Sequence, residues 1–139
     1  MKKEEFKKVL ILSASPRRKG NSQILCYKFA EGAKSTGHQV KMIRLSDKKI
    51  NFCIACDACM KNGGFCVQRD DMGDILKEYQ QADVLVLATP VYFYSLSAQL
   101  KILIDRMFAR EYEIRNSPKR KTAYLILTSG STDREQMHG

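Results

Sequence analysis

Four cysteines lie close together in residues 51–71, and their thiols are potential metal ligands. The cysteines are Cys53, Cys56, Cys59 and Cys66, with the spacing C-x2-C-x2-C-x6-C. Three thiols within seven residues are too close together to pair off as ordinary disulfides. Such compact runs are typical of a chain that wraps thiolates around one iron–sulfur cluster or one zinc ion. A cysteine loop that binds no metal is the remaining interpretation.

A polar, basic segment near the N-terminus indicates a phosphate site. Residues 13–22 read Ser-Ala-Ser-Pro-Arg-Arg-Lys-Gly-Asn-Ser and stand between an expected strand and an expected helix. Hydroxyls, backbone N–H groups and a helix N-terminus converge in such a loop and favour a bound phosphate. The segment contains neither G-x-G-x-x-G nor G-x-x-x-x-G-K-[ST], which argues against a dinucleotide Rossmann site and a P-loop. A polar turn on a basic surface is the alternative.

A second candidate segment, residues 89–95, reads Thr-Pro-Val-Tyr-Phe-Tyr-Ser and follows the most apolar stretch of the chain. Aromatic side chains at a binding edge offer a stacking surface to a flat heterocycle. They could equally cover the edge of the core.

These segments need a scaffold, and the hydrophobic pattern predicts one. Short apolar runs indicate strands at 8–13, 39–45, 83–89 and 121–128, with Pro90 ending the third. Helical spacing predicts a helix at 20–35, one that begins at Asp71 and one that begins at Ser97, with Asp71 and Ser97 as N-caps. The inward residues expected in the first and last helices are Ile24, Leu25 and Phe29, then Leu100, Leu103, Ile104, Met107 and Phe108.

Apolar strands that alternate with helices predict an α/β fold, a doubly wound parallel sheet in three layers. Ligands of such sheets bind at the carboxyl ends of the strands, so the loops after the first, third and fourth strands are the candidates. Only a short stretch follows residue 128, and the sheet is therefore expected to lack a fifth strand and last helix. The strand at 121–128 would then be an apolar edge that a partner chain covers, which predicts a homo-oligomer.

Composition narrows the class of protein further. The length of 139 residues predicts one domain, 1–139, with the cysteine-rich loop at 51–71. The net charge of +9 is spread over short basic groups without interleaved aromatics, so nucleic-acid binding is not expected. No apolar run suits a membrane span or signal peptide, which predicts a cytoplasmic protein with reduced thiols. Cys26 is expected to be a buried packing residue, and Asp105 and Arg106 to form structural or interface ion pairs rather than an acid–base pair.

Three segments in this order resemble the NADPH-dependent FMN reductase superfamily, and most closely its iron–sulfur flavoprotein type. They are the 13–22 loop, the cysteine run that ends in Asp70-Asp71-Met72, and T-P-V-Y-F-Y-S-L-S-A-Q-L-K-x-L-I-D-R from Thr89 to Arg106. The resemblance implies a flavodoxin-like fold, bound FMN and an NAD(P)H- or ferredoxin-linked oxidoreductase. In such a protein the flavin carries the chemistry, so no catalytic side chain is predicted.

The resemblance also implies roles for individual residues. The FMN phosphate would be held by Ser13, Ser15, Pro16, Arg17, Gly20, Asn21 and Ser22. The isoalloxazine ring would be flanked by Pro90, Val91, Tyr92, Phe93 and Ser95, with Ser129 and Gly130 closing a third side. A [4Fe–4S] cluster would be ligated by Cys53, Cys56, Cys59 and Cys66.

The sequence therefore predicts an FMN-binding oxidoreductase or electron-transfer flavoprotein with a small-molecule or ferredoxin-like redox partner, assembled as a dimer or tetramer. Two alternatives remain: an NAD(P)H-dependent FMN, quinone or azo reductase without a cluster, and a truncated flavin-binding or dimerising remnant without activity.

Overall fold

A computed structural model describes residues 5–118 and 120–130. The strands are β1 (Lys8–Ser13), β2 (Gln39–Arg44), β3 (Val84–Tyr92), β4 (Ser95–Leu96) and β5 (Thr122–Thr128). The helices are α1 (Asn21–Ser35), α2 (Ala58–Lys61), α3 (Met72–Gln81), α4 (Ala98–Arg106) and α5 (Glu111–Asn116). Two short 3-10 turns, Leu45–Asp47 and Met107–Arg110, follow β2 and α4.

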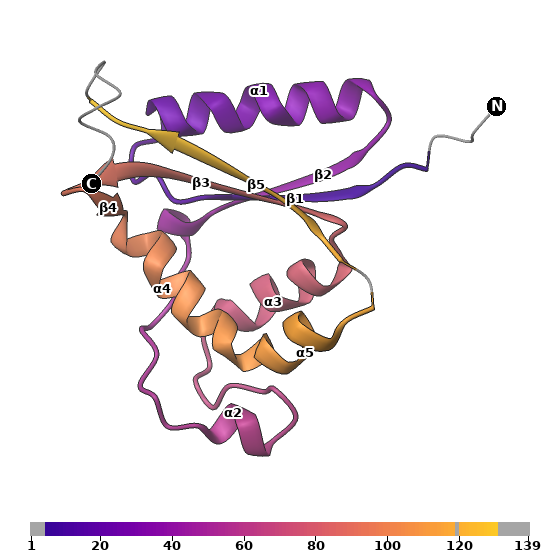
Figure 1. The fold of residues 1–139 in the computed structure, drawn as a ribbon. Helices are drawn as coiled ribbons and strands as arrows, with labels where there is room; N and C mark the ends of the chain where they lie inside the picture. The colour runs from indigo at the N-terminus through magenta and orange to yellow at the C-terminus, as the bar shows by residue number, and fades with distance from the viewer. Residues whose placement is uncertain (1–4, 119, 131–139) are drawn as a thin grey trace.

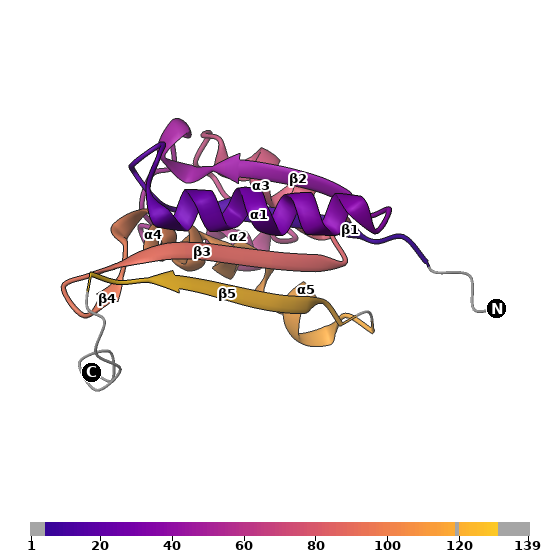
Figure 2. The same cartoon turned by 90° about the horizontal axis from the view of Figure 1, so that it is seen from above.

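The four longer strands form one parallel sheet in the order β2-β1-β3-β5, and β4 pairs antiparallel with the end of β3. Helix α1 covers one face of this sheet, and α3, α4 and α5 lie on the other (Figure 1). Seen from above, α1 runs along the strands and β5 lies at the edge (Figure 2). The predicted three-layer, flavodoxin-like α/β fold with a parallel sheet is confirmed.

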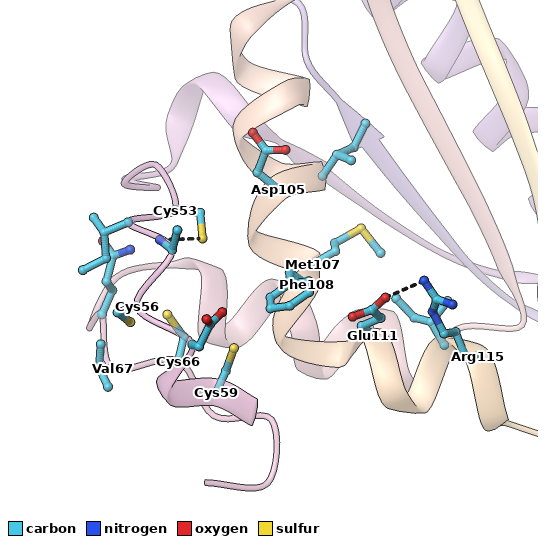
Figure 3. A pocket seen from close by; sticks show the side chains of 16 residues that line it. Cys53, Cys56, Cys59, Cys66, Val67, Asp105, Met107, Phe108, Glu111 and Arg115 are labelled. Atoms are coloured by element: carbon cyan, nitrogen blue, oxygen red, sulfur yellow. Dashed lines mark hydrogen bonds and ion pairs between the residues drawn. The ribbon is translucent and has the colours of Figure 1, made fainter. Parts of the chain in front are cut away.

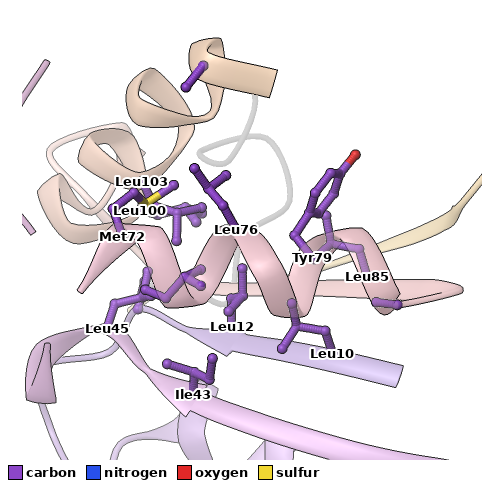
Figure 4. Close-up of a cluster of buried hydrophobic side chains, with 14 residues drawn as sticks. Leu10, Leu12, Ile43, Leu45, Met72, Leu76, Tyr79, Leu85, Leu100 and Leu103 are labelled. Atoms are coloured by element: carbon purple, nitrogen blue, oxygen red, sulfur yellow. The ribbon is translucent and has the colours of Figure 1, made fainter. Parts of the chain in front are cut away.

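Strand β1 lies at the centre because both of its faces are apolar. Since side chains alternate along a strand, Leu10 and Leu12 point to one face and Val9 and Ile11 to the other. Leu10 and Leu12 join a cluster with side chains of α3 and α4, among them Met72 (Figure 4). The sheet is therefore anchored on both sides, which fixes the loops at its carboxyl edge.

The inward face of α1 differs in part from the predicted one: Phe29 packs against the core as expected, but Ile24 and Leu25 do not. Ile24 and Leu25 are 48% and 44% exposed. The buried side chains of the helix are Ser22, Gln23, Cys26 and Ala30. Helical periodicity alone does not choose between two overlapping faces, and the sheet selects the one with small residues, which lets the helix approach closely. Cys26 is buried in this layer, as predicted.

Helix α4 differs from its prediction in the same way. Leu100 and Leu103 are buried, but Ile104 and Phe108 are exposed and line a cavity beside the cysteine loop. Neither Asp71 nor Ser97 makes a side-chain cap, although each stands at the N-cap position.

Strand β3 runs past the predicted stop. Pro90 is paired in register with Thr128 of β5, and the strand ends at Tyr92. Beyond Ala88 the strand has no ladder to β1, and a residue without an N–H is tolerated where pairing is one-sided. The segment predicted as a loop is thus a hairpin of β3 and β4.

Strand β5 pairs with β3 and carries apolar side chains that remain accessible. Tyr124, Leu125 and Leu127 are 49%, 57% and 51% exposed. Within the described part of the chain, no helix is long and apolar enough to cross a membrane.

Candidate functional site

The phosphate loop joins β1 to α1, and the start of that helix is open to a ligand. Helix α1 follows Gly20, which is extended and makes no side-chain cap, and the first turn of the helix has no acidic residue. The first N–H groups of a helix lack partners within the helix, and its dipole is positive at this end. The start of α1 is therefore suited to an anion.

Gly20 is required by the close packing of this loop. A Cβ at Gly20 would lie 2.9 Å from Ser15 Oγ and 3.2 Å from Arg17 Cβ. The Ser15 hydroxyl accepts the Arg17 N–H at 3.2 Å, and the Gly20 N–H donates to the Arg17 carbonyl at 3.2 Å. The chain therefore turns tightly around Ser15, and the Arg17 side chain is exposed.

Two of the predicted phosphate ligands use their hydroxyls inside the protein. Ser13 Oγ donates to Gln23 Oε1 at 2.6 Å, and Arg44 Nη1 donates to the same oxygen at 3.1 Å. Ser22 Oγ lies 2.6 Å from Thr128 Oγ1 and ties α1 to the end of β5. Ser13 and Ser22 therefore shape the loop through these side-chain contacts.

Sequence reasoning missed Gln23, Arg44 and Thr128, which hold this loop in place. In the sequence, only the position of Gln23 could have indicated this role, because it lies one helical turn before Cys26 on the buried face of α1. A polar residue on a buried face needs a hydrogen-bonding partner. The partners come from β1 and β2, which only the folded chain brings near.

The aromatic segment forms a tight hairpin with a strained tip. Phe93 and Tyr94 have φ angles of 47° and 61°, in the left-handed region. They are 97% and 79% exposed, so they do not cover the core. The Thr89 hydroxyl accepts the Ser97 N–H at 3.1 Å and holds the base of the hairpin. Left-handed backbone in non-glycine residues is concentrated at functional sites.

The three predicted flavin-binding segments end at the same edge of the sheet. Ser13 is in register with Ala88, and Thr128 is in register with Pro90. Ser129 and Gly130 directly follow Thr128, next to the hairpin. The fold therefore brings together the loops after β1, β3 and β5.

The cysteine loop lies elsewhere, beyond α4 on the face of the sheet opposite α1 (Figure 1). All four cysteines of the loop line one cavity of about 790 Å³. Its other wall is formed by α4, the 3-10 turn after it and α5, including Ile104 and Phe108, with Glu111 and Arg115 farther along (Figure 3). Ile104 of α4 and Phe108 of the turn after it thus face the cysteines.

The backbone of the cysteine loop is strongly bent. Ala55 and Asp57, on either side of Cys56, have φ angles of 53° and 54°. Gly64 has a φ of 85°, and a Cβ there would lie 2.7 Å from the Ala109 carbonyl oxygen. The loop therefore docks closely on the turn after α4, which keeps its thiols beside the cavity.

The thiols are free and partly buried. Cys53 and Cys56 are exposed, whereas Cys59 and Cys66 are half-buried. Burial raises the pKa of Cys59. Among the described residues, no three His, Cys, Asp or Glu side chains are grouped closely enough to hold a single metal ion. The four sulfurs share a cavity but are spread around it.

A buried ion pair anchors this loop. Arg106 Nη1 donates to Asp70 Oδ2 at 2.7 Å and Nη2 donates to Oδ1 at 3.1 Å, with both side chains almost fully buried. Burial raises the pKa of Asp70, but hydrogen bonds from Arg106 and from two backbone N–H groups outweigh it, so the pKa is lowered. Asp105 pairs with Lys101 at 2.6 Å on the surface. The predicted structural role of Asp105 and Arg106 is confirmed.

Comparison with known proteins agrees with this architecture. Residues 7–138 match the NADPH-dependent FMN reductase family. The chain is 37% identical over 100 residues to an iron–sulfur flavoprotein of Archaeoglobus fulgidus, covering 72% of this chain and 45% of that protein. It is 42% identical over 99 residues to an iron–sulfur flavoprotein of Methanocaldococcus jannaschii, covering 71% and 51%. The chain thus spans about half the length of these curated relatives.

The fold is shared with solved structures. An NAD(P)H:quinone oxidoreductase from Methanothermobacter marburgensis superposes with a TM-score of 0.76 at 21% identity, covering 94% of this chain and 68% of that one. At this identity the likeness concerns the fold alone. Because the family match extends over nearly the whole chain, the predicted family is confirmed: the protein belongs to the NADPH-dependent FMN reductase family.

Proposed function

We propose that residues 1–139 form one FMN-binding domain of an NAD(P)H- or ferredoxin-linked oxidoreductase. The observation that carries this proposal is the uncapped start of α1 behind Gly20, at the edge where three loops meet. The FMN phosphate would bind the loop that contains the proposed ligands Ser13, Ser15, Pro16, Arg17, Gly20, Asn21 and Ser22. Arg17 would supply positive charge, and the backbone N–H groups of Asn21 and Ser22 would supply donors.

The ring of the flavin would lie along the hairpin. Its neighbours would be Pro90, Val91, Tyr92, Phe93 and Ser95, with Ser129 and Gly130 on a third side. The exposed aromatic tip and the backbone of the hairpin offer a stacking surface and hydrogen-bonding groups for a flat heterocycle. Bound FMN would accept and donate electrons or hydride, while these residues bind and orient it.

We further propose that Cys53, Cys56, Cys59 and Cys66 ligate a [4Fe–4S] cluster. Four thiolates on one tetrahedral zinc ion would lie only about 3.8 Å apart, because Zn–S bonds are about 2.3 Å long. A cluster takes one thiolate on each of four iron atoms and so spreads its ligands further. Four cysteines that line one cavity support this proposal.

The phosphate proposal is tested by comparing FMN with riboflavin, which has no phosphate. Arg17→Ala should weaken FMN binding about 10–150-fold, because a charge-assisted hydrogen bond contributes about 1.5–3 kcal/mol. Riboflavin binding should stay within about twofold, since the lost contact is to the phosphate. Fluorescence titration measures both dissociation constants.

Lys28→Ala is the matched control, because it removes the same charge from a distant, exposed turn of α1 where Lys28 pairs with Glu31. It should leave both affinities unchanged. Equal losses of FMN and riboflavin affinity in Arg17→Ala would contradict the assignment of the phosphate loop. Absence of any flavin binding by the unaltered protein would favour a domain without redox activity.

We also propose a cytoplasmic homo-oligomer, a dimer or tetramer, with a small-molecule or ferredoxin-like redox partner. Five free thiols suit a reducing compartment. The apolar side chains of β5, exposed at the edge of the sheet, favour contact with a second chain. The net charge of +9 would attract an acidic partner.

Sedimentation velocity at micromolar concentration should therefore show a species larger than the 15.9 kDa monomer. Leu125→Lys should shift that species toward the monomer, whereas Ile24→Lys, an exposed apolar site on α1, should not. A monodisperse, FMN-loaded monomer for the unaltered protein would rule out the oligomer.

A further inference from the structure

Two of the three serines in the phosphate loop spend their hydroxyl hydrogens inside the protein. Ser13 Oγ donates to Gln23 Oε1 at 2.6 Å. Arg44 donates to the same atom at 3.1 Å, and because arginine carries only donors, that atom is the amide oxygen. Ser15 Oγ donates to the Arg17 carbonyl oxygen at 3.2 Å. Each hydroxyl has one hydrogen, so both hydrogens are held by oxygens that cannot donate in return.

Ser22 differs, because its partner is another hydroxyl. Its Oγ lies 2.6 Å from Thr128 Oγ1, and either atom could be the donor. Ser22 is 1% exposed and lies in the first turn of α1, whereas Thr128 is the last residue of β5 (Figure 1). When Thr128 donates, Ser22 can turn its own hydrogen to another acceptor and the bond between the two hydroxyls persists. Of these three serines, Ser22 can thus serve a ligand without losing a hydrogen bond.

A phosphate at the start of α1 would decide which hydroxyl donates. The oxygens of an ionised phosphate are strong acceptors, so a Ser22 hydroxyl bound to it must donate its single hydrogen. The contact with Thr128 is then kept only if Thr128 is the donor. Hydrogen bonds in such a chain polarise one another, and a hydroxyl that accepts a bond becomes a better donor.

We infer that Thr128 is a positioning residue of the phosphate site, whose hydroxyl donates to Ser22 Oγ and directs the Ser22 hydrogen to the FMN phosphate. This inference rests on the proposed FMN site. Thr128 acts through Ser22 and needs no contact of its own with the phosphate. The end of β5 therefore contributes to phosphate binding at the start of α1.

The test is Thr128→Val, which removes the hydroxyl and keeps the β-branched shape that suits a strand. We expect FMN to bind about 2–13-fold more weakly, the effect of one hydrogen bond, and riboflavin to bind within about twofold of the unaltered protein. Thr128→Ser should restore FMN affinity. Thr122→Val is the matched control: Thr122 is exposed at the other end of β5, on the same face, and its loss should change neither affinity. Fluorescence titration measures all dissociation constants.

A double variant separates positioning from a general effect on the strand. Ser22→Ala alone should weaken FMN binding about 10–150-fold, because it removes a hydrogen bond to a charged group. The double variant Ser22→Ala, Thr128→Val should bind FMN no more weakly than Ser22→Ala, since Thr128 has no other route to the phosphate. Losses that multiply would show that the two residues act independently and would overturn the inference.

The outcomes also separate this inference from the proposal beneath it. If the unaltered protein binds FMN no more tightly than riboflavin, the phosphate site and the role of Thr128 are both rejected. If Arg17→Ala removes the preference for FMN while Thr128→Val binds FMN as tightly as the unaltered protein or more tightly, only the role of Thr128 is rejected. Should Thr128→Val fail to fold, Thr128→Ala and Thr128→Ser, which differ by one hydroxyl, carry the same comparison.

Discussion

Asp70→Ala is expected to lower the free energy of unfolding by about 3–5 kcal/mol, because it leaves the Arg106 guanidinium buried without its counter-charge. The two side chains are 0% and 2% exposed. The substitution also removes the acceptor for two backbone N–H groups at the base of the cysteine loop. Urea unfolding followed by circular dichroism measures the change.

Asp105→Ala provides the control for this prediction. Asp105 precedes Arg106 on α4 and pairs with Lys101, but that pair is exposed and should contribute only about 0–1 kcal/mol. Both substitutions remove one carboxylate from an ion pair, so the comparison isolates the effect of burying that pair. Similar unfolding free energies for the two variants would show that the Asp70–Arg106 pair does not anchor the loop.

The contribution of Asp70 should depend on pH. Its pKa in the folded protein is lowered, because the hydrogen bonds from Arg106 and the backbone outweigh burial. The stabilisation is thus fully present above the unfolded pKa of about 3.9. It is lost as the pH falls through the lower folded pKa. The difference in unfolding free energy between the unaltered protein and Asp70→Asn should therefore shrink below about pH 4.

Cys56→Ser is expected to abolish stable loading of a [4Fe–4S] cluster and to leave FMN binding within about twofold. One ligand of four is lost, and the neighbouring backbone at Ala55 and Asp57 is held in left-handed conformations that leave the loop little freedom to offer a substitute. The phosphate loop leads from β1 into the start of α1, whereas the cysteine loop lies beyond α4 on the opposite face of the sheet (Figure 1), so the geometry of the phosphate loop should not change. Iron, acid-labile sulfide and FMN per chain are measured after anaerobic reconstitution.

Cys26→Ala is the control for the loss of a thiol, because Cys26 is buried on α1 and away from the cysteine loop. It should load iron like the unaltered protein. An unaltered protein with FMN but without iron would instead identify a reductase that uses no cluster. Zinc in place of iron would support the single-ion interpretation of the cysteine run.

The sequence alone predicted the architecture of this protein well. Continuous apolar runs such as 8–13 and 83–89 indicate buried parallel strands, and the structure contains both, although β3 continues past the predicted stop to Tyr92. The family was also predictable, because its three segments are local in sequence and occur in order. Both kinds of information lie in neighbouring residues and survive without knowledge of tertiary contacts.

Where the sequence allows two nearly equivalent local arrangements, only the tertiary structure determines which one forms. Helix α1 offers either Ile24 and Leu25 or Cys26 and Ala30 to the sheet, and the close approach of helix to sheet selects the small residues. Pro90 continues β3 although it has no N–H to donate. At this position β3 no longer pairs with β1, and Pro90 is in register only with Thr128 of β5.

The same distinction applies to the candidate sites. The types and spacing of the cysteines, and the serines and glycine of the phosphate loop, suggest both candidate sites from the sequence alone. The side-chain pairs that hold these loops in place could not be predicted from the sequence, because the partners are far apart along the chain. Three such pairs are separated by 21, 106 and 36 residues: Gln23 with Arg44, Ser22 with Thr128, and Asp70 with Arg106. Buried polar groups must find partners, but which partner each one finds depends on how the whole chain closes, and that is set by the packing of the sheet and its two helical layers.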